Sequence, residues 1–184
     1  LRARITLLHC TTDYPTPYED VNLKAMDTLA GAFGLPVGYS DHTPGIAVSL
    51  AAVARGAVVI EKHFTLDRTL PGPDHKASLE PDELAALVAG TRAVTAALGD
   101  GLKAPRPCEI PNIAVARKSL IAARDIAAGE VYTADAVAVK RPGSGRSPFD
   151  LWDILGQPSP RALKAGDLLP GGVFRVTAKP AACF

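Results

Sequence analysis

The stretches VGYSDHTPG, residues 37–45, and VIEKHFTLDR, residues 59–68, decide the fold. Each contains a short apolar run that leads into a histidine, His42 in the first and His63 in the second. A short apolar run bounded by turn residues is typical of a buried strand in a parallel sheet. In folds built from such strands, residues at the carboxyl ends of the strands face the active site. The two stretches therefore predict two histidines at one edge of a parallel sheet.

The residues around these stretches repeat a strand–helix pattern three times. The run RITLLHC, residues 4–10, predicts an earlier strand, and apolar spacing predicts helices at residues 21–33, 44–55 and 82–98. Repeated βα units form either a doubly wound sheet or a (β/α)8 barrel, and a barrel needs about 250 residues. We therefore expect an α/β fold whose parallel sheet is covered on both faces. If the fold is a TIM barrel, these three βα units are its C-terminal portion.

The character of the sequence changes after residue 102. The stretch GDGLKAPRPCEIPN, residues 99–112, is rich in Pro and Gly, which predicts a linker at residues 103–116. Residues 117–175 lack helical periodicity and alternate short β-like runs with turns, which predicts a small β-rich domain. Residues 176–184 are expected to form a loose tail. Residues 1–102 form the first predicted domain.

The composition is that of an ordinary globular protein. The 184 residues are 47% hydrophobic and 21% charged, with a net charge of +1. This balance favours neither nucleic acid nor a membrane surface as a partner, and we expect no membrane span and no signal peptide. The three cysteines are widely spaced, which predicts reduced thiols in a cytoplasmic protein and not a disulfide framework or a zinc site.

Polar residues gather where the three predicted strands end. These positions are His9–Thr12, Ser40–His42 and Glu61–His63. Two neutral imidazoles from neighbouring strand ends can bind one divalent metal and leave coordination positions open for a substrate. Such a site can polarise a carbonyl group. The alternative is that each histidine only forms a hydrogen bond with a nearby loop.

Three loops carry further candidate groups. LDRTLPGPDHKAS, residues 66–78, has the composition of a substrate-binding loop or of a solvated surface loop. TTDYPTP, residues 11–17, offers hydroxyl groups and an aromatic ring to a sugar or phosphate, or is only a rigid proline turn. KRPGSG, residues 140–145, is a basic turn that suits an anion or a polar substrate group, or is a solvated hairpin turn.

Taken together, these motifs closely resemble the sialic acid (N-acetylneuraminate) synthase family. The resemblance runs from about residue 5 to residue 172. It rests on four stretches in one order: LLHCTTDYPTPYEDVNLKAM (7–26), VGYSDHTPGI (37–46), AVVIEKHFTLDRTLPGPDHKASLEPDEL (57–84) and ARKSL…KRPGSG (116–145). The resemblance implies the C-terminal part of a (β/α)8 barrel followed by an antifreeze-like domain of the β-clip (SAF) type.

The resemblance also implies roles for individual residues. His42 and His63 match the family's metal ligands, and the metal is a divalent ion, usually Mn²⁺, with Mg²⁺ or Co²⁺ as alternatives. The other matches are Thr12 and Ser40 for phosphoenolpyruvate, Tyr14, Asp74 and Arg141 for the sugar, and Glu61 as an acidic residue lining the same pocket. Arg146, which follows the KRPGSG turn, departs from the apolar residue of many family members.

The implied reaction joins phosphoenolpyruvate to an N-acyl-mannosamine-type sugar and releases phosphate. The implied assembly is a domain-swapped homodimer in which Arg141 reaches the barrel of the other subunit. Family members are nearly twice as long as this chain, so we expect the 184 residues alone to expose unpaired strand edges and to lack synthase activity.

Three other interpretations compete with this one. The second domain resembles ice-binding proteins, so the chain could be a non-catalytic module that binds ice or carbohydrate, although Lys140, Arg141 and Arg146 make that surface charged. The chain could also be a truncated remnant. Among enzymes, the sugar-acid synthases that make Kdo share the chemistry but lack the small second domain.

Overall fold

The computed structural model describes residues 4–171. The chain folds into two compact units, Leu1–Gly101 and Leu102–Phe184. Residues 172–175 of the expected second domain, the expected tail and Cys183 lie outside the described residues.

The first unit is built on a parallel sheet of three strands in the order β1-β2-β3. The strands are β1 (Leu7–Cys10), β2 (Val37–Asp41) and β3 (Ile60–Lys62). Leu7 pairs with Val37, and Ser40 pairs with Glu61. All three strands run in one direction, so their carboxyl ends lie at one edge of the sheet.

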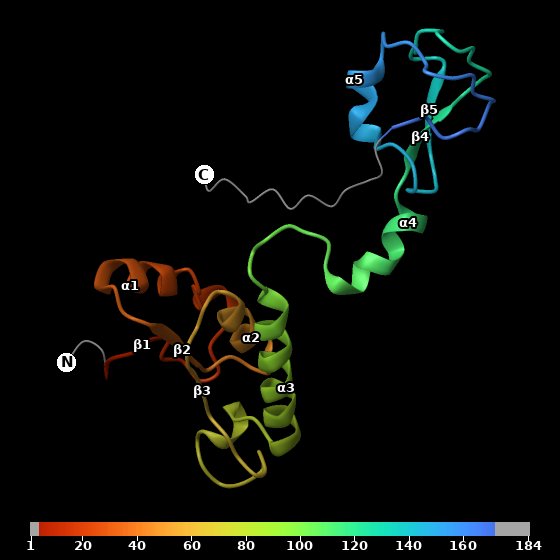
Figure 1. Ribbon diagram of the computed structural model, residues 1–184. Helices are drawn as coiled ribbons and strands as arrows, with labels where there is room; N and C mark the ends of the chain where they lie inside the picture. Colours follow the sequence, from red (N-terminus) through yellow and green to blue (C-terminus); the bar gives the residue numbers. More distant parts are fainter. Residues whose placement is uncertain (1–3, 172–184) are drawn as a thin grey trace. The chain divides into compact units, whose positions relative to one another are not determined.

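Helices follow each strand of this unit (Figure 1). The α-helices are α1 (Ala25–Phe33), α2 (Ala47–Ala54) and α3 (Pro81–Leu98), with short 3₁₀ turns at η2 (Tyr18–Asp20) and η3 (His75–Ala77). Helix α3 begins with a capping box, in which the backbone N–H of Glu80 donates to the carboxylate of Glu83 at 3.0 Å. Gly99 follows its last turn with φ 62°.

Two predicted helices begin later than the apolar spacing indicates. Helix α1 begins at Ala25 and not at residue 21, because Asn22 has a positive φ of 47° and cannot continue a helix. Helix α2 begins at Ala47 and not at residue 44, after Gly45 with φ 69°.

Among residues 4–101, the apolar core around the sheet lies on one face of that sheet. Val37 and Tyr39 of β2 pack against Met26 of α1 and Ala52 of α2. On the opposite face, Leu8 and Val59 are 36% and 43% exposed. The expectation that both faces are covered is therefore wrong for the described residues, because the helices pack against the face that carries Tyr39.

The second unit is a small structure with few regular elements. Strand β4 (Ser119–Ala122) pairs antiparallel with β5 (Val137–Lys140), and single bridges join Ile121 to Leu168, Ile126 to Leu163 and Val131 to Pro158. Its helical turns are η4 (Pro107–Asn112), α4 (Ile113–Ala116), η5 (Pro148–Asp150) and α5 (Leu151–Ile154). Much of the stretch predicted to be a plain linker is therefore helical.

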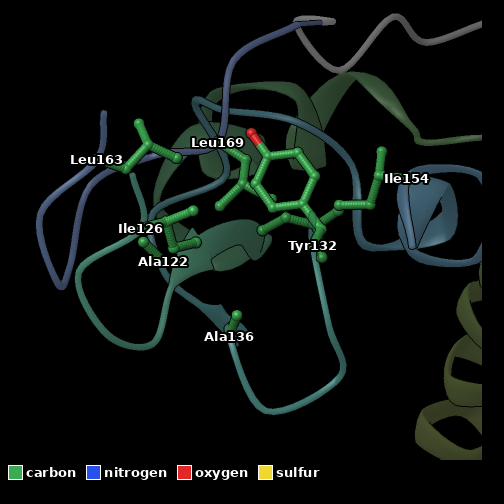
Figure 2. Close-up of a cluster of buried hydrophobic side chains, with 8 residues drawn as sticks. Ala122, Ile126, Tyr132, Ala136, Ile154, Leu163 and Leu169 are labelled. Carbon is green, nitrogen blue, oxygen red and sulfur yellow. The ribbon is translucent and has the colours of Figure 1, made fainter. Parts of the chain in front are cut away.

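A compact apolar cluster holds the second unit together (Figure 2). Its buried members are Leu120, Ala122, Ile126, Tyr132, Ala136, Ile154, Leu163 and Leu169. The buried hydroxyl of Tyr132 donates to Ser159 Oγ at 2.9 Å, so this polar group is satisfied inside the cluster. Side chains from the turns thus supply a core that two short strands alone would not provide.

The sequence also predicts reduced cysteine thiols and no membrane span. Cys10 and Cys108 are free and exposed thiols. Among the helices of residues 4–171, none has the length and apolar character needed to cross a membrane.

Candidate active site

The carboxyl ends of β1, β2 and β3 bring the predicted histidines together. The imidazole rings of His42 and His63 have centroids 5.2 Å apart and meet edge to face, at an interplanar angle of 71°. The ring of Tyr14, from the loop after β1, lies 4.1 Å from that of His42 and 5.4 Å from that of His63. Three rings from three successive strand ends therefore form one cluster, the ring cluster.

The loop after β1 fixes the orientation of His42. Nδ1 of His42 lies 2.9 Å from the carbonyl oxygen of Thr11 and 3.7 Å from Cys10 Sγ. A carbonyl oxygen only accepts, so Nδ1 carries the proton and Nε2 keeps its lone pair. The backbone N–H of Thr16 donates to the carbonyl oxygen of His42 at 2.9 Å and holds the loop in place.

This arrangement fits a divalent metal with two protein ligands. A histidine that donates Nδ1–H to a backbone carbonyl is oriented in the way that metal-ligating histidines usually are. Within residues 4–171, no group of three or more His, Cys, Asp and Glu side chains could hold a metal ion. A metal here would therefore use His42 and His63 as its protein ligands. Its other coordination positions would be left for oxygen ligands that do not come from these four kinds of side chain.

Ser40 and Glu61 lie on the open face of the sheet. The hydroxyl of Ser40 donates to Glu61 Oε1 at 2.6 Å, and these two residues are register partners in β2 and β3. Ser40 is buried, while Glu61 is exposed. The hydrogen bond holds the Glu61 carboxylate at the sheet edge that carries the ring cluster.

The loop after β3 brings Asp74 to the same edge. Asp74 Oδ2 lies 3.9 Å from His63 Nδ1, and its side chain is 61% exposed. Thr65 Oγ1 and His75 Nδ1 form a 2.7 Å hydrogen bond across the loop. The exposed carboxylate is therefore available to a ligand above the rings.

Arg68 secures the base of this loop. Its Nε donates to the Ser78 carbonyl oxygen at 2.9 Å, and its guanidinium group pairs with Glu83 of α3. The hydrogen bond from Arg68 lowers the pKa of Glu83, and the same bond raises the pKa of Arg68. Sequence reasoning recognised Arg68 only as one charge of a loop.

The other two predicted residues, Thr12 and Arg141, lie in different units of the chain. Thr12 is exposed in the loop after β1. Arg141 belongs to the second unit, where it is exposed and its Nε donates to the Ala116 carbonyl oxygen at 3.0 Å. Its predicted contact with a sugar in another subunit stays a prediction.

Sequence reasoning missed the network beneath the ring cluster. Asp41 and Lys62, which directly precede His42 and His63, form a buried ion pair, with Oδ2 and Nζ 3.1 Å apart. Burial also raises the pKa of Tyr39 to about 12, and the carboxylate of Asp41 adds to this effect. The signal for this network in the sequence was a charged residue, Asp41 or Lys62, at the end of each apolar strand run.

Two family models match the chain. The NeuB family model matches residues 1–103, and the SAF domain model matches residues 117–172.

Individual relatives agree with these matches. The chain is 52% identical to the N,N'-diacetyllegionaminic acid synthase of Campylobacter jejuni over 91% of its own length and 50% of the relative. It is 43% identical to the human N-acetylneuraminate-9-phosphate synthase over 85% of its length and 44% of the relative. The chain thus spans about half the length of the curated relatives it matches.

A solved structure is also similar. The crystal structure of the sialic acid synthetase from Leptospira borgpetersenii serovar Hardjo-bovis aligns with a TM-score of 0.53 and 48% sequence identity. The alignment covers 59% of this chain and 38% of that one.

Proposed function

Because the chain belongs to the NeuB family and carries an SAF domain after its NeuB part, we propose that it is the C-terminal half of a nonulosonic acid synthase. The reaction joins phosphoenolpyruvate to an N-acyl-mannosamine-type sugar and releases phosphate. The first unit contributes three βα units to a (β/α)8 barrel. The synthases named among its relatives support this class of product.

The ring cluster is the observation that carries the proposal. His42, His63 and Tyr14 come from three successive strand ends, and Ser40, Glu61 and Asp74 lie at the same edge. An open edge with two imidazoles and two carboxylates suits a polar substrate that carries a carbonyl group.

His42 and His63 would hold the divalent metal, with Mn²⁺ as the first candidate. When bound, the metal supplies Lewis acidity toward the aldehyde of the open-chain sugar. His42 is suited to this role because its Nδ1 proton is donated to Thr11 and its Nε2 lone pair is free.

The remaining residues bind and orient the two substrates. Ser40 and Thr12 hold phosphoenolpyruvate, while the Tyr14 ring and the Asp74 carboxylate contact the sugar. C3 of phosphoenolpyruvate forms a bond with the aldehyde carbon of the sugar. A water molecule adds at C2, and phosphate leaves with cleavage of its C–O bond. Holding both substrates in one cluster removes most of the entropic cost of bringing them together.

Glu61 is the residue proposed to handle the proton of the incoming water. Its carboxylate already accepts the Ser40 hydroxyl at 2.6 Å, which fixes its position while its exposed side remains available. The step then needs only a short movement of the proton toward a group that is already in place.

The test uses an extended protein, defined as a fusion that places the N-terminal half of the Campylobacter jejuni relative before Leu1. Phosphate release is followed with phosphoenolpyruvate, Mn²⁺ and, separately, N-acetylmannosamine or a 2,4-diacetamido-trideoxy hexose. The relative itself serves as the positive control, and the 184-residue chain alone is assayed beside it. Sugar-dependent release that a chelator abolishes would support the proposal and identify the preferred sugar. A folded extended protein that releases no phosphate would favour a non-catalytic module.

A further inference from the structure

A buried ion pair lies directly beneath the ring cluster. Asp41 ends β2 and Lys62 ends β3, and the two are register partners in the sheet. Their side chains are 0% and 3% exposed, and Lys62 Nζ lies 3.1 Å from Asp41 Oδ2. Removing two charges from water is costly, and their attraction compensates for this only when further hydrogen bonds satisfy both groups.

Further hydrogen bonds do satisfy both groups. Asp41 Oδ1 accepts from the backbone N–H of Thr43 at 2.9 Å and from its hydroxyl at 2.8 Å. Asp41 Oδ2 accepts from the hydroxyl of Ser49 in α2. Lys62 Nζ donates to the Thr43 carbonyl oxygen at 2.7 Å. The network therefore ties the ends of β2 and β3 to each other and to the following helix.

The two histidines are the immediate neighbours of this network. His42 lies between Asp41 and Thr43, and Thr43 is hydrogen-bonded to both members of the ion pair. His63 directly follows Lys62. Side chains alternate along a strand, so the residues that directly follow Asp41 and Lys62 start on the face of the sheet opposite the ion pair. Because Asp41 is held against Lys62, the backbone positions of His42 and His63 are also fixed relative to each other. The ring centroids of these two histidines are 5.2 Å apart.

Stability alone does not explain an ion pair at this position. Buried ion pairs can often be replaced by apolar residues of similar volume with no loss of stability. An apolar pair is not directional, however, and would leave the strand ends free to shift along each other. We propose that Asp41 and Lys62 are positioning residues, which set the spacing of His42 and His63 so that both can bind one divalent metal. This inference rests on the metal site of the proposed function.

The test compares two neutralised ion pairs of the first unit. The variant D41N/K62M removes the charges and keeps the volume, and Asn can still accept from Thr43. The control D27N/R55M removes the Asp27–Arg55 pair, whose side chains are 58% and 35% exposed. Mn²⁺ binding to the 184-residue chain is measured by the electron paramagnetic resonance of the free ion. Nuclear Overhauser effects between the ring protons of His42 and His63 report their spacing without metal.

We expect D41N/K62M to bind Mn²⁺ at least about 10-fold more weakly, which is the scale of effect seen for groups that orient metal ligands. The nuclear Overhauser effects between its His42 and His63 rings should also weaken. D27N/R55M should keep the Mn²⁺ affinity and the nuclear Overhauser effects of the unmodified chain. Unchanged affinity and unchanged ring contacts in D41N/K62M would overturn the inference and leave the proposed function intact.

Two further outcomes are also decisive. If the unmodified chain binds no Mn²⁺, the proposed metal site fails for this chain, and the ring contacts alone then test the positioning role. If D41N/K62M does not fold, T43V replaces it, because this substitution removes only one hydroxyl donor to Asp41. T43V is expected to weaken Mn²⁺ binding several-fold, and wild-type affinity with wild-type ring contacts would overturn the inference.

Discussion

The carbonyl oxygen of Val59 lies only 2.5 Å from the position that a Cβ atom on Gly38 would occupy. On the other side, Leu8 Cδ2 lies 2.6 Å from the same position. The Val59 oxygen also accepts the backbone N–H of Tyr39 at 2.9 Å, so it cannot move without loss of that hydrogen bond. The sheet therefore requires glycine at the second residue of its central strand.

Gly38→Ala should destabilise the first unit by about 1–3 kcal/mol, the usual cost of overpacking. The matched control is Gly31→Ala in α1, where no atom beyond the helix's own neighbouring backbone lies within 4 Å of the added Cβ. That control should stabilise the unit by about 0.5–1 kcal/mol, because alanine favours a helix over glycine. Hydrogen exchange of the Tyr39 amide measures both effects in this unit. Equal exchange rates of the Tyr39 amide in the two variants would contradict the close approach of Val59 and Leu8 to Gly38.

His42→Ala and His63→Ala should each lower Mn²⁺ affinity by at least about 100-fold, since either change leaves one imidazole ligand. In the extended protein, each should also abolish chelator-sensitive phosphate release. His9→Gln is the control, because His9 Nε2 lies 2.8 Å from the Val21 carbonyl oxygen and His9 pairs with Tyr39 on the helix-covered face. Near-normal Mn²⁺ binding by either alanine variant would remove that histidine from the metal site.

Arg68→Met should return the pKa of Glu83 toward its ordinary value near 4.5. In the folded chain the hydrogen bond from Arg68 lowers this pKa, so the contact stabilises the loop above the ordinary pKa of Glu83. Its contribution is lost as the pH falls through the lower, folded-state pKa. A pH titration of the Glu83 carboxyl carbon by NMR measures the change. Glu130 is the control, because its partner Arg124 lies in the second unit. A Glu83 titration unaffected by Arg68→Met would show that the pair does not form in solution.

The three strands and the meeting of His42 with His63 at one sheet edge could be predicted, because both follow from local sequence pattern. Apolar runs mark the strands, and parallel strands end at one edge of a sheet. The position of Tyr14 against both rings could not be predicted, since it depends on how the loop after β1 folds back onto His42. The hydrogen bond between Ser40 and Glu61 depends on the register of β2 with β3, which periodicity does not specify.

The errors in the predicted secondary structure have similar physical causes. Proline content predicts a linker before residue 117, but Pro107 begins a 3₁₀ turn, where its missing N–H costs nothing. Asn22 interrupts a helical pattern that apolar spacing alone would continue. The buried pair of Asp41 and Lys62 is hard to predict, because charges at strand ends suit a solvent-facing site as well as a core beneath it.

Arg141→Ala, made in the extended protein, should raise the KM for the sugar about 10- to 100-fold, the value of a hydrogen bond to a charged group. The KM for phosphoenolpyruvate should change much less. Arg141→Lys should recover only part of the loss, because an ammonium group lacks the planar fork of guanidinium. Lys140→Ala, the neighbouring change in β5, is the control and should leave both KM values unchanged. An unchanged sugar KM in Arg141→Ala would remove this residue from sugar binding.

Mixing Arg141→Ala with His63→Ala tests whether Arg141 acts in the other subunit of a dimer, when activity is assayed at a sugar concentration far below the raised KM of Arg141→Ala. In a domain-swapped dimer of one Arg141→Ala chain and one His63→Ala chain, one site keeps both His63 and Arg141. Random mixing makes about half of the dimers mixed, each with one intact site of two, so activity should recover to about a quarter of wild type. If each site were built from a single chain, every site in the mixture would lack one of the two residues. The mixture would then be no more active than the two variants measured separately, and the domain-swapped arrangement would be excluded.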